Sequence, residues 1–360
     1  MNILILGQPE SHHPGKWAKA LAKNHDVIFG FFDGDRKITS LDQLKTPPTM
    51  HTEIIGKNIN IKYIRNLLYR WEMNSFMRHK GWRSRALRKF VKQHDIDVIF
   101  AHGLGYYSYI AAGNKLVPVV SASYGSEVFQ YFSEIVQYVI DKVDAIQCTS
   151  PLMHHTILDR NSDANVHEFY WGVDCSLFRP RSYLREGNTI PLIYFSRGMS
   201  DIYRGDFIVE TLEKFQSPQN IVLSTHLVTK KQLERIKETP HNIYYHDYNM
   251  PLEEYAIFIA GTDIMVSIPI SDQIGNSVME FMAAGIPMIL SDLSVYDPVF
   301  GIENVEVADL SSPSALAKQI ENFGINDGEE IRQFAEDNFN WETAVTNFEL
   351  MCLDVNPDLL

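Results

Sequence analysis

The chain has 360 residues, of which 45% are hydrophobic and 21% charged, and its formal net charge is −13. This length predicts two domains of roughly 150 residues each, and no apolar run approaches the roughly 18 residues that a membrane-spanning helix needs. The first residues lead into a short apolar strand and lack the features of a secretory signal, so we expect a cytoplasmic protein.

Short apolar runs rich in β-branched residues predict buried parallel strands in both halves of the chain. In the first half they cover 2–6, 26–32, 97–101, 117–123 and 145–150. In the second half they cover 191–196, 220–225, 242–247, 263–269 and 287–292, with predicted helices at 205–215, 229–238, 251–260 and 312–323. This alternation predicts an α/β protein made of two doubly wound domains.

The segment 172–191 is polar and contains Pro and Gly, which is typical of a junction between domains. We therefore expect an N-terminal domain over 1–178 and a C-terminal domain over 185–340. No strand follows the helical pattern after Asn340, so we expect 341–360 to pack back on the N-terminal domain. Ligands of open parallel sheets bind beyond the carboxyl ends of the strands, which makes a cleft between the two domains the expected site.

One segment, 62–92, is strongly basic in an otherwise acidic chain. It holds ten Lys and Arg residues and one acidic residue, Glu72, interleaved with aromatic side chains. The acidic remainder disfavours nucleic acid as a partner. Two interpretations of 62–92 stay open. Either it forms amphipathic helices with solvated charges, or it makes a peripheral contact with the inner face of an anionic membrane or with a lipid-linked acceptor.

The cysteines, Cys148, Cys175 and Cys352, are odd in number and far apart. This disfavours a disulfide framework and a cysteine-based zinc site. The histidine pairs at 12–13 and 154–155 lack the spacing of metal ligands. We therefore expect no metal and no bound cofactor.

The stretch 271–285 reads SDQIGNSVMEFMAAG and follows a predicted strand. The amides of Gly275, Asn276 and Ser277 would begin a helix, and a helix N-terminus attracts phosphate. Asp272 on the loop and Glu280 one turn inside the helix could then bind the hydroxyls at the two ends of a nucleotide sugar. The alternative is an ordinary helix with an acidic residue near its start and a glutamate on its surface.

The loop GQPESHHPGKW at 7–17 has two glycines and a lysine, which invites a phosphate-loop interpretation. A Walker A motif needs four residues between its glycines and Ser or Thr after the lysine. Seven residues separate Gly7 from Gly15 here, and Trp17 follows Lys16, so the ATPase interpretation fails. Gly15 and Lys16 remain candidates for contact with donor phosphates or with an acceptor, and Trp17 is expected to pack against the sheet.

Six segments in order resemble the retaining GT-B glycosyltransferases of family 4, over nearly the whole chain. They are HHPGKWAKALAKNHDV (12–27), DVIFAHG (97–103), YGSEVF (124–129), GVDCSLFRP (172–180), SRGMSDIYRG (196–205) and the run from Asp272 through FMAAGIPMILSD. The resemblance implies the GT-B fold, two Rossmann-like domains facing across a cleft with a C-terminal helix that crosses back. Lys16, Arg204 and Asp272 depart from the family, which usually has Arg, Lys and Glu there.

The resemblance also implies roles for site residues. Arg197 and Arg204 would neutralise the donor diphosphate, beside the amides at the start of the helix, and Glu280 would bind the ribose. His102 would contact the transferred sugar, and Asp272 would hydrogen-bond its hydroxyls. Together, the expected catalytic residues are His102, Arg197 and Asp272.

On the acceptor side we expect His13 and Glu127. For Glu127 three interpretations stay open, namely contact with the acceptor, contact with a neighbouring loop and an ordinary surface carboxylate.

The expected function is retaining transfer of a hexose-type sugar from a nucleotide-diphosphate sugar, a UDP-sugar in preference to a GDP-sugar. The acceptor would be a hydroxyl of a glycan or of a lipid-linked molecule, and the nucleotide sugar would be the co-substrate. Two alternatives stay open. One is a nucleotide-sugar epimerase on the same fold, and the other is a non-catalytic binding subunit.

Overall fold

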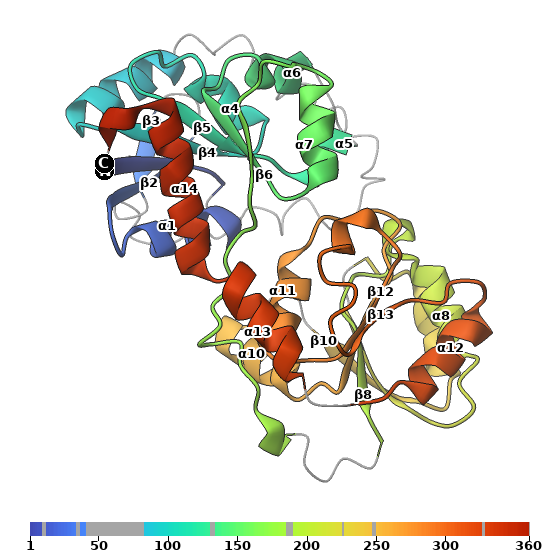
Figure 1. The fold of residues 1–360 in the computed structure, drawn as a ribbon. Coiled ribbons are helices and arrows are strands. Elements are labelled where there is room, and N and C mark those ends of the chain that lie inside the picture. Colours follow the sequence, from blue (N-terminus) through green and yellow to red (C-terminus); the bar gives the residue numbers. More distant parts are fainter. Residues whose placement is uncertain are drawn as a thin grey trace. The chain divides into compact units, whose positions relative to one another are not determined.

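The computed structural model describes residues 1–8, 12–33, 37–40, 83–129, 134–184, 190–224, 227–246, 250–325 and 328–359. These residues form two compact units (Figure 1). Unit 1 comprises Met1–Cys148, Met153–Phe169 and Val345–Leu360, and unit 2 comprises Thr149–Leu152 and Tyr170–Ala344.

Unit 1 contains a seven-stranded sheet in the order β3-β2-β1-β4-β5-β6-β7, in which only β2 and β3 pair antiparallel. The strands are β1 (Asn2–Leu6), β2 (Asp26–Asp33), β3 (Lys37–Ser40), β4 (Val98–His102), β5 (Val119–Ala122), β6 (Ala145–Cys148) and β7 (Val166–Glu168). The helices are α1 (His12–Leu21), a helix over 83–93, α4 (Tyr106–Ala111), α5 (Gly125–Phe129), α6 (Glu134–Ile140) and α7 (Pro151–Leu158). Both faces of the sheet are covered, because successive residues of the central strand β1 are all fully buried from Ile3 to Leu6.

Unit 2 contains a six-stranded parallel sheet in the order β10-β9-β8-β11-β12-β13. The strands are β8 (Leu192–Phe195), β9 (Asn220–Ser224), β10 (Asn242–His246), β11 (Ile264–Ser267), β12 (Met288–Leu290) and β13 (Val305–Val307). The helices are α8 (Gly205–Leu212), α9 (Lys230–Lys237), α10 (Leu252–Ala260), α11 (Asn276–Ala283), α12 (Pro313–Asn322) and α13 (Glu329–Asn338). Short 3-10 turns are η2 (Ser182–Leu184), η3 (Asp201–Tyr203), η4 (Ser294–Tyr296) and, in unit 1, η5 (Pro357–Leu359).

All ten predicted strands are present. Four are one or two residues shorter than predicted, three are three residues shorter, and the other three have the predicted length or one residue more. Three further strands, β3, β7 and β13, were not predicted. Each has three or four residues and lies at the edge of its sheet. An edge strand this short needs no continuous apolar run, so its sequence carries little signal.

Apart from Thr149–Leu152, unit 2 begins at Tyr170. This residue lies eight positions before the boundary expected at 178. The segment after this point is held by unit 2 through hydrogen bonds to the Arg332 side chain of α13 and to Phe339, the residue after α13. Val173 N donates to Phe339 O at 2.6 Å, and Arg332 donates to the carbonyl oxygens of Phe178 and Cys175 at 3.2 Å each. Composition marks where polar residues cluster, and it carries no information on which domain they bond to.

The last helix, α14 (Trp341–Val355), begins in unit 2 and continues into unit 1 from Val345 (Figure 1). In unit 1, the buried ring of Phe348 lies 5.9 Å from Trp17 and 4.7 Å from Phe100, measured between centroids. His25 Nε2 lies 2.8 Å from a carboxylate oxygen of Glu349. The C-terminal residues are therefore part of the core of unit 1.

Residues 62–82 of the basic segment lie outside the described residues. The described part, 83–92, belongs to a helix whose side chains Leu87 and Val91 are buried, while Arg85 and Lys89 are exposed. This part is therefore amphipathic, a character that both interpretations share, and its Arg83 is buried. In the described residues, no helix is both long and apolar enough to span a membrane.

Candidate functional site

In unit 2 the carboxyl ends of two paired strands bring Arg197 and Asp272 together. β8 and β11 are parallel neighbours, with Phe195 opposite Val266. Arg197 lies two residues beyond β8 and Asp272 five residues beyond β11. Arg197 Nη2 forms an ion pair with Asp272 Oδ2, and the Tyr296 hydroxyl donates to the same oxygen at 2.6 Å.

The guanidinium of Arg197 keeps its charge in this partly enclosed position. Burial by itself would lower the pKa of Arg197, but the carboxylate of Asp272 and the phenols of Tyr296 and Tyr203 more than offset it, so the pKa is raised. The guanidinium carbon also lies 5.8 Å from the centroid of the Tyr203 ring, a cation–π contact. A permanently charged guanidinium therefore lies beyond the carboxyl end of β8 in the unit 2 sheet.

Gly275, the residue before α11, lies directly against this guanidinium. A Cβ built on Gly275 would meet Arg197 Nη1 at 2.9 Å and Cζ at 3.0 Å, with Nη2 closer still. The backbone of Gly275 is extended, with φ −77°, so this position needs glycine for space and not for its dihedral angles. Because Gly275 has no side chain, it supplies no side-chain cap to the first amides of α11.

Arg204 lies where η3 meets α8 and adopts the left-handed conformation, with φ 55° and ψ 40°. This conformation disfavours any residue with a Cβ by roughly 1–2 kcal/mol. The turn is closed by two backbone hydrogen bonds to Ser200 O, from Tyr203 N at 3.0 Å and from Gly205 N at 3.1 Å. Strain of this kind is typical of functional sites.

Several buried polar atoms of unit 2 have no hydrogen-bond partner within the described part of the chain. They lie in the segment between β8 and α8, at the end of β11 and in the first turn of α11. The atoms are the hydroxyls of Ser196, Ser200, Ser267 and Ser277 and the Nε atoms of Arg197 and Arg204. Buried polar groups normally form hydrogen bonds. Several such groups without a hydrogen bond along these segments therefore indicate a site for a polar ligand. Two arginines and a helix N-terminus make an anion the fitting ligand.

Glu280 lies in the second turn of α11 and is only 5% exposed, so the alternative of a surface glutamate is wrong. Burial first and then the charge of Glu280 raise the pKa values of Tyr194 and Tyr255, which places its carboxylate near both phenols. The Tyr194 hydroxyl in turn lies 2.9 Å from His246 Nδ1. Glu280 is therefore part of a buried polar cluster with Tyr194, Tyr255 and His246, and it is not exposed to solvent.

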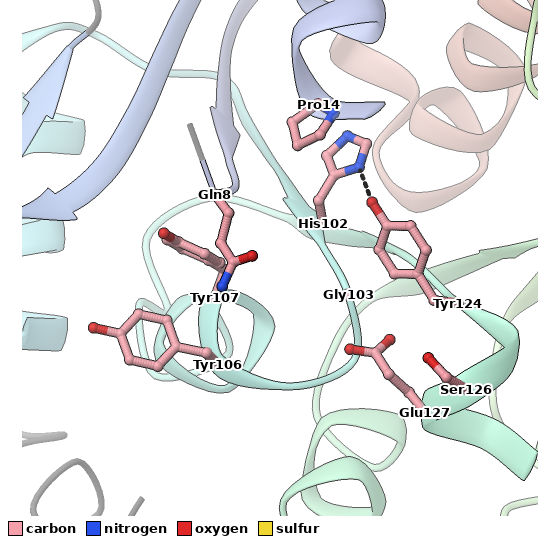
Figure 2. Close-up of a pocket in the computed structure, with 9 residues that line it drawn as sticks. All are labelled: Gln8, Pro14, His102, Gly103, Tyr106, Tyr107, Tyr124, Ser126 and Glu127. Atoms are coloured by element: carbon pink, nitrogen blue, oxygen red, sulfur yellow. Dashed lines mark hydrogen bonds between the residues drawn. The ribbon is translucent and has the colours of Figure 1, made fainter. Parts of the chain in front are cut away.

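Unit 1 has a pocket of about 270 Å³ at the carboxyl ends of β1 and β4 (Figure 2). His102, the last residue of β4, lines it together with Gly103, and its Nδ1 lies 3.1 Å from the Tyr124 hydroxyl. Burial, with a smaller contribution from His13, lowers the pKa of His102 to about 3. His102 is therefore a neutral imidazole at physiological pH.

Glu127, on α5, also lines this pocket. Its Oε2 accepts a hydrogen bond from Leu104 N at 2.7 Å, and its Oε1 would lie 2.7 Å from a Cβ built on Gly103, which has φ +87°. Burial raises the pKa of Glu127 to about 7, although backbone N–H groups of Leu104, Tyr124 and Gly105 act in the opposite direction. Of the three interpretations of Glu127, contact with a neighbouring loop is confirmed and a surface carboxylate is wrong.

The first residues of α1 contribute differently from what Gly15 and Lys16 suggested. Pro14 lines the pocket, and the His13 ring lies 5.8 Å from the Tyr124 ring. Gly15 and Lys16 lie on α1 but are not among the lining residues, and a Cβ on Gly15 would meet no atom within 4 Å. Trp17 is fully buried against Phe100, at 5.3 Å between ring centroids, as expected.

The structure thus forms two clusters from the candidate residues. In unit 2, Arg197 forms an ion pair with Asp272 and lies against Gly275, and Arg204, Asn276, Ser277 and Glu280 lie on the same or neighbouring segments. His102, His13 and Glu127 gather around the pocket of unit 1. Sequence reasoning missed Tyr296, which lies 24 residues from Asp272 and carries no motif, and the pocket residues Gln8, Tyr106, Tyr107, Tyr124 and Ser126. Tyr106 and Tyr107 could have been found, because they closely follow a predicted strand that ends at the expected site.

No family model and no curated protein sequence matches the chain. Solved structures do match it. A sucrose-phosphate synthase from Thermosynechococcus elongatus is 15% identical, with a TM-score of 0.70 and 97% of both chains covered. The chain has the GT-B fold. A glycosyltransferase from Rickettsia africae is also 15% identical, with a TM-score of 0.67 over 99% of this chain and 98% of that one. HepE from Anabaena, in complex with UDP-glucose, is 12% identical, with a TM-score of 0.66 and 99% of both chains covered. The fold implied by the sequence motifs is therefore confirmed.

Proposed function

We propose that this protein is a retaining glycosyltransferase. It transfers a hexose-type sugar from a UDP-sugar to a hydroxyl of a glycan or of a lipid-linked acceptor. Glycosyltransferases are among the solved structures of this fold that it resembles, and HepE was solved with UDP and with UDP-glucose. These complexes support uridine over guanosine in the donor.

The observation that carries the proposal is the anion site of unit 2. Arg197 keeps its positive charge against Gly275, and Arg204 is held in a strained conformation on the neighbouring turn. The orphaned hydroxyls of Ser196, Ser200 and Ser277 add hydrogen-bond donors along the same segments. A diphosphate would satisfy these donors, and the dipole of α11 would favour its charge.

In this mechanism the diphosphate is the leaving group, and stabilising its developing charge is the main task of the protein. Arg197 and Arg204 supply that charge stabilisation in place of a metal ion. The departing phosphate accepts the proton of the incoming hydroxyl on the same face of the sugar, so no carboxylate forms a covalent sugar intermediate. Glu280 would bind the ribose, and neutral His102 would hydrogen-bond the transferred sugar.

Asp272 acts mainly on Arg197 in this scheme. Its Oδ2 accepts hydrogen bonds from Arg197 Nη2 and from the Tyr296 hydroxyl. The bond to Arg197 holds the guanidinium against Gly275. Its other oxygen, Oδ1, is left to accept a hydrogen bond from a sugar hydroxyl. Asp272 therefore combines a positioning role with the expected sugar contact.

Calorimetric titration with UDP, GDP and UDP-glucose tests the proposal, with thermal unfolding as a second readout. A ligand at 100 times its dissociation constant should stabilise the fold by about 2.7 kcal/mol. Arg197→Ala should weaken UDP binding by at least tenfold. Arg179→Ala, a change at an exposed arginine of the same unit, should leave UDP affinity unchanged. Absence of binding by every nucleotide and nucleotide sugar would contradict the proposal.

Assays of the reaction products, with and without an acceptor, distinguish the proposal from its alternatives. Release of UDP in the presence of an acceptor, with the product's anomeric configuration equal to the donor's by NMR, is expected. Isomerisation of UDP-glucose without an acceptor would indicate an epimerase instead. Activity that persists in excess EDTA is expected, because the arginines supply the charge; its loss would contradict a metal-independent reaction.

A further inference from the structure

We propose that Glu127 is a positioning residue for His102. Its ionised carboxylate holds two segments, the loop that follows His102 in the chain and the backbone of Tyr124, whose hydroxyl bonds the His102 ring. This inference rests on the proposed function, in which His102 hydrogen-bonds the transferred sugar. It adds a residue that controls this contact and makes the contact depend on pH.

The first segment that Glu127 holds is the loop 103–105. Glu127 Oε2 accepts a hydrogen bond from Leu104 N at 2.7 Å, and the carboxylate also accepts one from Gly105 N. Gly103 has φ +87°, and Figure 2 shows the Glu127 carboxyl beside this glycine. The carboxylate therefore orients the two residues through which the chain continues from the end of β4 towards α4.

The second segment is the start of α5, in which Glu127 is the third residue and Tyr124 is the residue before the helix. The carboxylate accepts a hydrogen bond from Tyr124 N, as a glutamate in the first turn of a helix can do. The Tyr124 hydroxyl lies 3.1 Å from His102 Nδ1, and Figure 2 shows this bond. Glu127 therefore acts on the ring of His102 through Tyr124.

The protonation state of Glu127 decides whether all three N–H groups have an acceptor. An ionised carboxylate only accepts hydrogen bonds, whereas a protonated carboxyl group carries a donor and has fewer acceptor sites. Burial raises the pKa of Glu127 to about 7, although the three N–H groups act in the opposite direction. His102 should therefore be held more firmly as the pH rises through 7.

Other titratable groups surround Glu127, and the test has to separate them. Burial lowers the pKa of His102 to about 3, so its own ring does not titrate near pH 7. His13 contributes to that pKa shift, and its ring lies 5.8 Å from the Tyr124 ring, so a change near pH 7 could also come from His13. The remaining described groups of this kind are the pocket phenols of Tyr106, Tyr107 and Tyr124, and Arg83, whose guanidinium carbon lies 5.4 Å from the Tyr106 ring centroid.

Histidine NMR of the full chain, without any ligand, is the first test. His102→Gln assigns the ring signals of His102 by their loss from the ¹³C-histidine spectrum. In the wild type these signals should shift with a midpoint near pH 7, although the ring itself stays neutral. The shift should persist in His13→Gln and disappear in Glu127→Gln. Signals that do not change near pH 7, or a change that disappears in His13→Gln instead, would overturn the proposal.

Glu127→Gln should fold, because it resembles the protonated form in size and charge. The backbone of Gly103 is also bonded separately, since its N donates to Ala122 O at 2.9 Å and its O accepts from Ser108 Oγ at 2.5 Å. Glu127→Asp, with a shorter carboxylate, is the second variant and should move the midpoint of the His102 shift. An identical midpoint in a folded Glu127→Asp would also overturn the proposal.

Calorimetry with UDP-glucose and with UDP measures what the positioning does. The ratio of the two affinities should be at least threefold lower in Glu127→Gln than in the wild type at pH 8, and equal in the two proteins at pH 6. The affinity for UDP alone should not differ between them, because only the sugar meets His102. In a His102→Gln background, Glu127→Gln should have no further effect on the ratio. A persisting effect would mean that Glu127 acts on the sugar without His102, which would overturn the positioning role.

The two proposals fail in different ways. Absence of UDP binding would contradict the proposed function. An unchanged His102 spectrum would contradict the role of Glu127 alone, because the NMR measurement needs no nucleotide.

Discussion

The guanidinium of Arg197 lies against the backbone of Gly275, in the space that a side chain would occupy at any other residue type. The sequence predicted that the amide of Gly275 would face a bound phosphate at the start of a helix. In the structure the approaching group is an arginine of the same unit. This contact joins the segment after β8 to the start of α11, and Asp272 and Tyr296 fix it from the other side.

Gly275→Ala should therefore displace the Arg197 guanidinium while leaving the fold intact. The three atoms nearest to the methyl group would all belong to the end of the Arg197 side chain, and the extended backbone accepts alanine. We expect a loss of at least tenfold in UDP affinity, with little change in the free energy of unfolding. Gly324→Ala is the matched control, because a Cβ there meets no atom within 4 Å. Unchanged UDP affinity in Gly275→Ala would show that the position of Arg197 does not matter.

Arg204→Gly should separate stability from binding. Glycine adopts the left-handed conformation of this residue without penalty, so the free energy of unfolding should stay the same or rise by about 1 kcal/mol. UDP affinity should fall at least tenfold, because a cation is lost. Arg204→Lys keeps the charge and the strain, and should keep most of the affinity. Chemical denaturation and calorimetry measure the two effects, and full affinity in Arg204→Gly would remove Arg204 from the anion site.

Tyr296→Phe removes the hydroxyl that donates to Asp272 at 2.6 Å. The ring is fully buried and stays in place, so the expected loss is that of one hydrogen bond to a charged acceptor, about 1.5–3 kcal/mol of stability. The turnover number should fall more than UDP affinity, because Asp272 and Arg197 lose part of their orientation. Wild-type turnover in Tyr296→Phe would contradict a positioning role for this tyrosine.

Glu127 should make the protein less stable as pH rises from about 4.5 to 7. Its pKa is about 7 in the folded state against an ordinary value of 4.5, so the folded state holds more protons in this window and deprotonation favours unfolding. The slope is at most about 1.4 kcal/mol per pH unit. Glu127→Gln keeps an oxygen for Leu104 N and should flatten this slope. Denaturation curves at several pH values measure it, and parallel slopes in both proteins would refute the shift.

His102 should act in the opposite direction. Its pKa is about 3 in the folded state against an ordinary value of 6.5, so the unfolded state binds more protons between these values. Its contribution to stability is complete above pH 6.5 and is lost as the pH falls towards 3. His102→Gln cannot be protonated and should lose less stability on acidification than the wild type. Comparing each variant with the wild type separates His102 from Glu127, although their pH windows overlap.

The amino-acid sequence by itself determined much of this protein. Apolar runs placed ten strands, because a buried parallel strand needs continuous hydrophobic residues, and the order of six short motifs implied the GT-B fold. The motif around Gly275 also predicted an anion site at the start of a helix, and the structure has α11 begin there; this prediction uses only the backbone and the local sequence.

Only the tertiary structure decided which side chains meet. It paired Asp272 with Arg197, added Tyr296, buried Glu280 near two phenols and bonded Glu127 to the loop after β4. It also placed the segment from Tyr170 onward in unit 2, where Val173 N donates to Phe339 O and Arg332 of α13 donates to Cys175 O and Phe178 O. The physical reason is the same in each case. Contacts between residues far apart in the chain depend on how sheets and helices pack, and no local pattern of residue types records that packing.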